Sequence, residues 1–215
     1  MPAELGPATE VRHPARAAIS PVFELSFALF ATKRLRAHEG RPEPEWLAAI
    51  QVDSPDLFER LATFWDDLEP YPEWGEVLIV ASDAGVVLDE SIDRFLGILD
   101  LELQRPHPVP RLPSEPDEVQ GIIERRLRRL RESEALRREY VGLIRQFWAF
   151  LTPYWEDAAK PFARAFARDL QAQLDAGADI RDLVPPSHFC QREMFPALVD
   201  DALRSARFVI VPMGL

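Results

Sequence analysis

Apolar side chains recur every three or four positions along most of this chain, which is the spacing of an amphipathic helix. The clearest case begins at Ser20, a suitable N-cap, with Pro21 at the first helical position and Gly40 beyond its end. The same signals predict helices over about 20–38, 44–52, 72–83, 89–103 and 187–205, two that open at Ser54 and Ser114, one around 140–148, and one from Pro153 to Gly177. The predicted fold class is all-α, a multi-helix bundle.

The helical pattern stops near the C-terminus, where RFVIVP at residues 207–212 is a β-branched run that ends at a proline. This run predicts a short C-terminal β-strand. A single strand needs a partner for its backbone N–H and C=O groups. We therefore expect its mate to be missing from this sequence or to come from another chain, as if the protein were cut short.

Proline content suggests how the chain is organised. Residues 104–116 read QRPHPVPRLPSEP and hold five prolines, which is typical of a linker or a rigid crossover. The linker would separate an N-terminal helical subdomain, 20–103, from a C-terminal helical subdomain, 117–215, that ends in the strand. Close packing of both into one domain is the alternative. Residues 1–19 are expected to form a flexible N-terminal arm, because prolines and charges stand where a secretory signal would need an apolar core.

One sequence box occurs twice: Phe-Trp-x-x-Leu-x-Pro-Tyr covers residues 64–71 and again 147–154. In each copy the proline disfavours helical geometry at the preceding residue, so we expect a helix, a corner and a second helix with an aromatic lining. Aromatic walls with an acidic rim can hold an apolar or cationic small molecule, whereas ordinary core packing is the alternative. The candidate ligand-binding residues are Trp65, Tyr71, Trp74, Trp148, Tyr154 and Trp155.

Arginine is concentrated in ERRLRRLRESEALRRE, residues 124–139. The interleaved glutamates are typical of an exposed helix face held by salt bridges. A contact with a second subunit or an anionic effector is the alternative, because arginine pairs well with carboxylates and phosphates. The candidate subunit-contact residues are Arg125, Arg126, Arg128 and Arg129.

Charge and composition exclude several classes of partner. The formal net charge of −11 repels the phosphate backbone, so this chain alone is not expected to bind nucleic acid. No uncharged apolar run is long enough to span a membrane. Cys190 is the single cysteine, which rules out an internal disulfide and suits a reducing cytoplasm.

The residues that usually carry chemistry are scattered. The four histidines have no helical partners, and His188 with Cys190 is too small a set for a metal site. There is no P-loop, no G-x-G-x-x-G and no G-x-S-x-G. We therefore expect no catalytic residue, no metal and no cofactor, and predict that the protein is not an enzyme.

Three stretches resemble parts of a known family. SPVFELSFALFA at 20–31 resembles the Ser-Pro-x-Phe/Tyr-Glu-Leu opening of the helical N-terminal region in some bacterial winged-helix regulators of the ArsR type. RFVIVPMGL at 207–215 is similar to the strand with a Val-Pro ending that precedes their DNA-binding winged helix, and 147–177 is similar to their long middle helices. The resemblance implies a helical effector-binding or dimerising region. We expect the DNA-reading winged helix itself to be missing from this chain.

Taken together, these patterns predict the effector-sensing and dimerisation region of a transcriptional-regulator-like protein, a homodimer that responds to a small molecule. Two alternatives stay open. One is a structural protein–protein interaction module that binds no ligand, and the other is an enzyme of unrecognised type.

Overall fold

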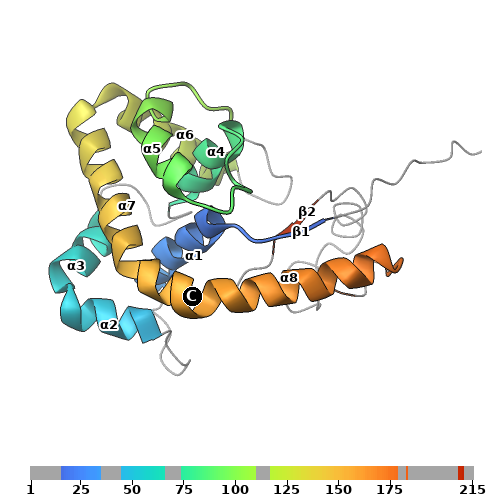
Figure 1. The fold of residues 1–215 in the computed structure, drawn as a ribbon. Helices are drawn as coiled ribbons and strands as arrows, with labels where there is room; N and C mark the ends of the chain where they lie inside the picture. Colours follow the sequence, from blue (N-terminus) through green and yellow to red (C-terminus); the bar gives the residue numbers. More distant parts are fainter. Residues whose placement is uncertain are drawn as a thin grey trace, which may run out of the picture. The chain divides into compact units, whose positions relative to one another are not determined.

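The computed structural model describes residues 16–34, 45–65, 74–109, 117–178, 183 and 208–210. Most of these residues are helical, so the predicted all-α class is confirmed (Figure 1). The helices are α1 (Pro21–Arg34), α2 (Glu45–Asp53), α3 (Pro55–Thr63), α4 (Gly75–Asp83), α5 (Asp93–Glu102), α6 (Asp117–Glu132), α7 (Glu134–Tyr154), the π-helix η2 (Trp155–Ala159) and α8 (Lys160–Asp175). Two short strands, β1 (Arg16–Ala18) and β2 (Phe208–Ile210), complete the described elements. The predicted helix over 187–205 lies outside the described residues.

Local signals set several helix ends as predicted. The Ser20 hydroxyl accepts a hydrogen bond from the Phe23 N–H at 3.0 Å and donates one to the carbonyl of Val87, so it both caps α1 and ties it to a distant loop. Pro55 occupies the first turn of α3. Gly177 follows α8 with a φ of 89°, a conformation that glycine adopts without a steric penalty.

The described chain forms two compact units, and the boundary between them is not at the predicted linker. The larger unit is Ile19–Arg164, and the smaller one holds β1, β2 and α8 from Ala165 onward. The predicted C-terminal subdomain, 117–215, contains α6 and α7, but these helices pack against α3, α4 and α5 of the predicted N-terminal subdomain, 20–103. The two-subdomain prediction is therefore wrong, because the apolar faces on either side of residues 104–116 are buried against each other.

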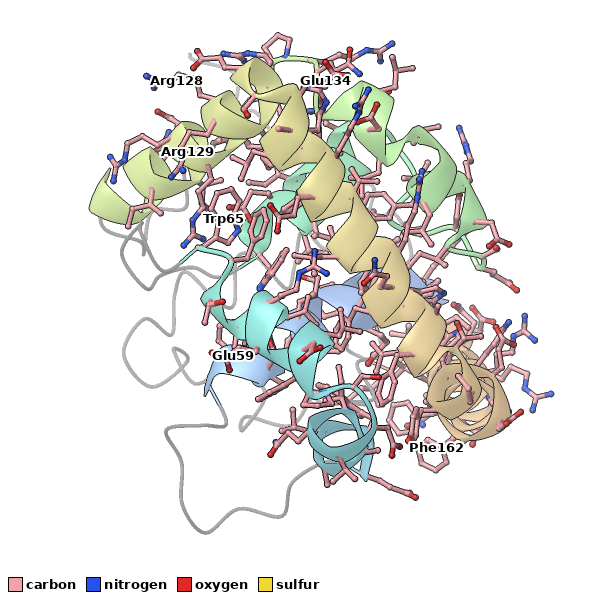
Figure 2. All side chains as sticks on the ribbon, turned by 90° about the vertical axis from the view of Figure 1, so that its left-hand side faces the viewer. Glu59, Trp65, Arg128, Arg129, Glu134 and Phe162 are labelled. Atoms are coloured by element: carbon pink, nitrogen blue, oxygen red, sulfur yellow. The ribbon has the colours of Figure 1, made fainter. Side chains whose placement is uncertain are left out.

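Helix α7 lies at the centre of the larger unit, where it contacts α2, α3, α5 and α6. Its apolar residues cover more than one face, so a single neighbouring helix could not bury them all. Figure 2 shows the side chains that fill the space around it. The fully or almost fully buried apolar residues of α7 are Val141, Leu143, Ile144, Phe147 and Leu151.

The two copies of the Phe-Trp box do not form similar corners. In the second copy, α7 continues through Pro153 to Tyr154 and runs directly into η2 and α8. Because Pro153 has no N–H, it cannot donate a helical hydrogen bond. The backbone hydrogen bonds change to the π-helical pattern just after it, and the Trp155 N–H is shared between the carbonyls of Leu151 and Thr152. In the first copy, α3 ends at Thr63 and the Phe-Trp pair lies in the following turn. The predicted second corner is therefore wrong, and the rest of the first box lies outside the described residues.

In the smaller unit, β1 and β2 pair as a parallel two-stranded sheet in which Ala17 is opposite Val209. The Ala17 N–H also donates to Oε1 of Gln171 in α8 at 2.9 Å. The prediction that the mate of the C-terminal strand lies outside this sequence is therefore wrong. Residues 16–18 supply it, so this part of the predicted 1–19 arm is ordered in a strand.

The described part of the chain contains no candidate membrane-spanning helix. None of its helices combines the length and the apolar character needed to cross a bilayer.

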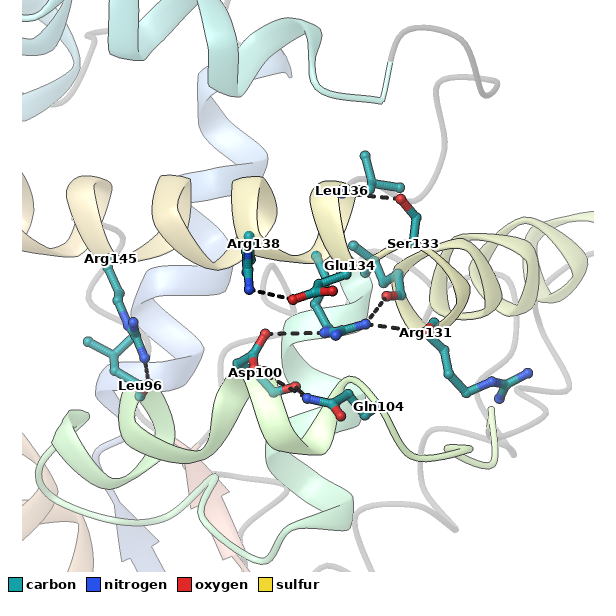
Figure 3. A network of polar contacts seen from close by, with 11 residues as sticks. Leu96, Asp100, Gln104, Arg131, Ser133, Glu134, Leu136, Arg138 and Arg145 are labelled. Carbon is teal, nitrogen blue, oxygen red and sulfur yellow. Dashed lines mark hydrogen bonds and ion pairs between the residues drawn. The ribbon is translucent and has the colours of Figure 1, made fainter.

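Arg137 of α7 stabilises the junction between α6 and α7. Figure 3 shows the polar contacts at this junction, with Asp100, Arg131 and Ser133 labelled. The Arg137 guanidinium donates to the carbonyls of Leu130 and Arg131, at 3.1 and 3.2 Å, which lie in the last turn of α6. The same group donates to the Asp100 carboxylate of α5 at 3.1 Å. Carbonyls at a helix end have no partner within their helix, so one side chain here satisfies two of them and links three helices.

Replacing Arg137 by Met is expected to lower the free energy of unfolding by about 2–4 kcal/mol, because it removes three charge-assisted hydrogen bonds from a side chain that is only 9% exposed. Urea denaturation would measure the loss. Arg138→Met is the matched control: Arg138 makes an exposed ion pair with Glu134 one turn away, and its loss should cost about 0.5 kcal/mol or less. Equal losses in the two variants would contradict this role of Arg137.

Candidate functional site

The most unusual feature of the larger unit is a fully buried pair of opposite charges. Glu76, in the first turn of α4, and Arg126, in α6, both have 0% exposed side chains. Nη1 of Arg126 lies 3.5 Å from Oε1 of Glu76, across a sequence separation of 50 residues. Charged side chains are almost never fully buried unless they are paired, so this contact is what permits both residues to lie in the core.

Aromatic rings surround the pair. The Tyr140 ring of α7 stacks on Trp74 with centroids 5.2 Å apart and lies 5.6 Å from Phe64 and 6.0 Å from Trp65. The Arg126 guanidinium lies over the Trp65 ring, 5.1 Å from its centroid, which is a cation–π distance. These residues make up the core cluster: Phe64, Trp65, Trp74, Glu76, Arg126 and Tyr140.

Hydrogen bonding in the core cluster is incomplete. Within the described ranges, Nε1 of Trp65, Oε2 of Glu76 and the hydroxyl of Tyr140 are buried and have no hydrogen-bond partner. Each such atom costs about 1–3 kcal/mol relative to hydration in the unfolded chain. Buried polar atoms without a protein partner are few in native proteins, so this cluster is the candidate functional site.

Burial changes the acid–base properties of the core cluster. It raises the pKa of Glu76 from 4.5 to about 7, and the nearby Arg126 opposes this shift only in part. Burial, together with the charge of Glu76, raises the pKa of Tyr140 well above 10, so the phenol stays neutral. The folded state keeps the Glu76 proton at pH values where the unfolded chain has lost it. The free energy of unfolding should therefore fall as the pH rises from about 4.5 to about 7, by up to about 1.4 kcal/mol per pH unit.

The predicted ligand-binding aromatics separate into two groups. Trp65 and Trp74 belong to the core cluster, whereas Trp148 and Trp155 contact each other at the α7–η2 junction with centroids 6.3 Å apart. Tyr140 and Trp148 are eight residues apart on α7, about 12 Å along its axis. Tyr154 packs on Phe150 at 5.7 Å, and Tyr71 lies outside the described residues. The rings of each group pack against one another, as the core-packing alternative expects, and ligand binding stays a prediction.

The predicted subunit-contact arginines differ in their surroundings. Arg126 is buried in its own chain, so it does not lie on a contact surface. Arg129 is half-buried, and its guanidinium carbon lies 6.0 Å from the centroid of the Trp65 ring. Figure 2 labels both residues. Arg125 and Arg128 are exposed and form no ion pair with any residue that the structure describes. The salt-bridged interpretation of this run holds for Arg138 with Glu134.

Sequence reasoning missed Glu76 and Tyr140 as site residues. Glu76 directly precedes the apolar stretch VLIVA, residues 77–81. A carboxylate beside such a stretch is a signal that a charge is buried. Tyr140 fits the apolar stripe of α7 and gives no such signal. Neither pattern shows that Arg126 is the partner, because that depends on how α4 packs against α6.

Across residues 16–34, 45–65, 74–109 and 117–178, no three His, Cys, Asp or Glu side chains lie close enough together to hold a metal ion. His188 and Cys190 lie outside those ranges. Comparisons with protein-family models, curated proteins and solved structures find no match to this chain.

Replacing Arg126 by Met is expected to lower the free energy of unfolding at pH 8 by about 3–5 kcal/mol, because it leaves the buried Glu76 carboxylate without its counter-charge. The double variant Glu76→Leu/Arg126→Met should recover most of that loss, since it leaves neither charge buried. Urea denaturation of the wild type and both variants would measure this. A single variant as stable as the wild type would show that the pair is not coupled.

Proposed function

We propose that this chain is the effector-sensing and dimerising helical region of a transcriptional-regulator-like protein. The resemblance of residues 20–31 and 147–177 to the helical region of ArsR-type regulators supports this role. The observation that carries it is the core cluster, where a buried charged pair lies among aromatic rings at the meeting of α4, α6 and α7.

A core selected only for stability would not keep this cluster. Replacing a buried ion pair by apolar residues of similar volume is often neutral or stabilising by 1–4 kcal/mol. Retaining charges at such a cost is common where a protein needs a switchable or functional element. In this protein, the free-energy cost of burying Glu76 and Arg126 weakens the packing of α4 against α6.

The mechanism we propose is a population shift between two packings of these helices. An effector that binds one packing more tightly changes its population, and about 5.5 kcal/mol of differential affinity suffices to reverse a 1:99 equilibrium. Helix α6 contributes Arg126 to the core cluster and carries Arg125 and Arg128 on its exposed side. A shift of α6 would therefore reach the surface that we propose for the subunit contact.

Effector binding can be tested by thermal denaturation with panels of neutral, cationic and anionic aromatic compounds. A true effector at about 100 times its Kd should add about 2.7 kcal/mol of stability, roughly 5–10 °C in Tm for a chain of this size. Tyr140→Phe, which removes only the unpartnered hydroxyl, should reduce that shift. Tyr154→Phe, which removes a hydroxyl from a ring that packs on Phe150 outside the core cluster, should not reduce it. No shift with any panel would remove small-molecule sensing from the proposed function.

The subunit contact is supported by a local charge imbalance. Arg125 and Arg128 are three residues apart on one helix face, exposed, and without ion pairs in the described ranges, while the whole chain carries a net charge of −11. A second copy therefore offers an acidic surface to these arginines.

Arg125→Glu/Arg128→Glu is expected to convert a dimer to a monomer, measured as a halving of the mass by light scattering at moderate salt. Arg94→Glu/Arg168→Glu changes the net charge equally at exposed positions elsewhere and should leave the mass unchanged. If both double variants behave like the wild type, the α6 face is not the contact. A dimer that depends on Arg125 and Arg128 but responds to no compound would instead favour an interaction module without a ligand.

A further inference from the structure

Resting on the proposed sensing role, we propose that the core cluster binds a proton as its effector: the buried Glu76 carboxyl takes up and releases a proton in the folded protein, and the packing of α4 against α6 depends on that proton. The proton would bind Oε2 or Oε1 of the Glu76 carboxyl, within the site described above.

The geometry favours a very small ligand. The Glu76 side chain is 0% exposed, and Trp74 stacks directly on both Phe64 and Tyr140, with centroids 5.6 and 5.2 Å apart. In this packing, rings in direct contact leave no room between them for a second planar molecule, so an organic effector would have to bind the other packing. A proton needs no space, and Oε2 of Glu76 is a buried acceptor with no hydrogen-bond partner among the described residues.

The charges around Glu76 set the response. Arg126 of α6 and Tyr140 of α7 interact electrostatically with its carboxylate. The other helices packed on α4 each carry one buried carboxyl group: Glu24 in α1, and Glu102 in α5, which pairs with Arg105 at 2.9 Å. Arg126 is therefore the cation that the structure places against Glu76, at a single 3.5 Å contact.

The neutral and ionised forms of Glu76 differ in how well they are stabilised between α4 and α6. A neutral Glu76 removes one buried charge and leaves Arg126 on the face of Trp65, 5.1 Å from the centroid. An ionised Glu76 is held by one contact with Arg126 and by its own backbone N–H, and its Oε2 has no partner among the described residues, so hydration favours any opening of α4 from α6. Raising the pH through neutrality should loosen this interface, and the raised pKa of Glu76, about 7, agrees with that direction.

The test compares the free energy of unfolding of the wild type and Glu76→Gln, by urea denaturation at pH 5.5, 6.5, 7.5 and 8.5. Relative to Glu76→Gln, the folding equilibrium constant of the wild type should fall by up to about tenfold per pH unit below pH 7 and level off above pH 8. Glu102→Gln, an equally small change at another buried carboxyl, should follow the wild type. If Glu76→Gln folds poorly, Glu76→Leu/Arg126→Met replaces it as the reference without this carboxyl.

A second readout reports the interface directly. Tryptophan fluorescence of the folded protein should titrate with a midpoint near pH 7 in the wild type and not in Glu76→Gln, and Trp65→Phe should remove most of the change. Parallel pH profiles of the wild type and Glu76→Gln in both experiments would overturn the inference. That result would leave the compound panels and the Arg125/Arg128 dimer test untouched, and those two experiments decide the proposed function on their own.

Discussion

The burial of α7 is the constraint on which the larger unit depends. The apolar side chains of α7 face more than one direction, so all of them are buried only when α2, α3, α5 and α6 pack around it together. Fully burying each large apolar side chain contributes about 1.5–3 kcal/mol. Because α6 joins α7 at Ser133 and Arg137 fastens the junction, this packing also decides where α6 meets α4.

The core cluster forms where α6 packs against α4, and its buried charges oppose that packing. Removing Glu76 and Arg126 from water costs several kcal/mol per ion, and the 3.5 Å contact between them offsets part of that cost. The rings stacked around Tyr140 supply apolar contact that holds the site together. The site is thus well packed and electrostatically strained at once, a combination that lets a small chemical change alter helix packing.

Proline at position 153 shows how burial overrides a local rule. The preceding residue, Thr152, is disfavoured in a helix, so the local pattern predicts a corner there. The burial of Leu151 and Trp155 on either side keeps the chain helical instead, and the missing N–H is accommodated by the π-helix that follows. The two Phe-Trp boxes consequently have different structures despite their identical spacing.

The sequence by itself determined the helical class and several helix ends, such as those at Ser20, Pro55 and Gly177, because capping, proline and glycine effects act within a few residues. It also marked Trp65 and Trp74 as candidates, since aromatic residues carry a large share of any core. Only the tertiary structure decided that Glu76 meets Arg126, that residues 16–18 pair with 208–210, and that residues 104–116 do not divide the helices into two domains. These contacts join distant parts of the chain, and they are selected by the burial and backbone hydrogen bonding of the whole fold rather than by neighbouring residues.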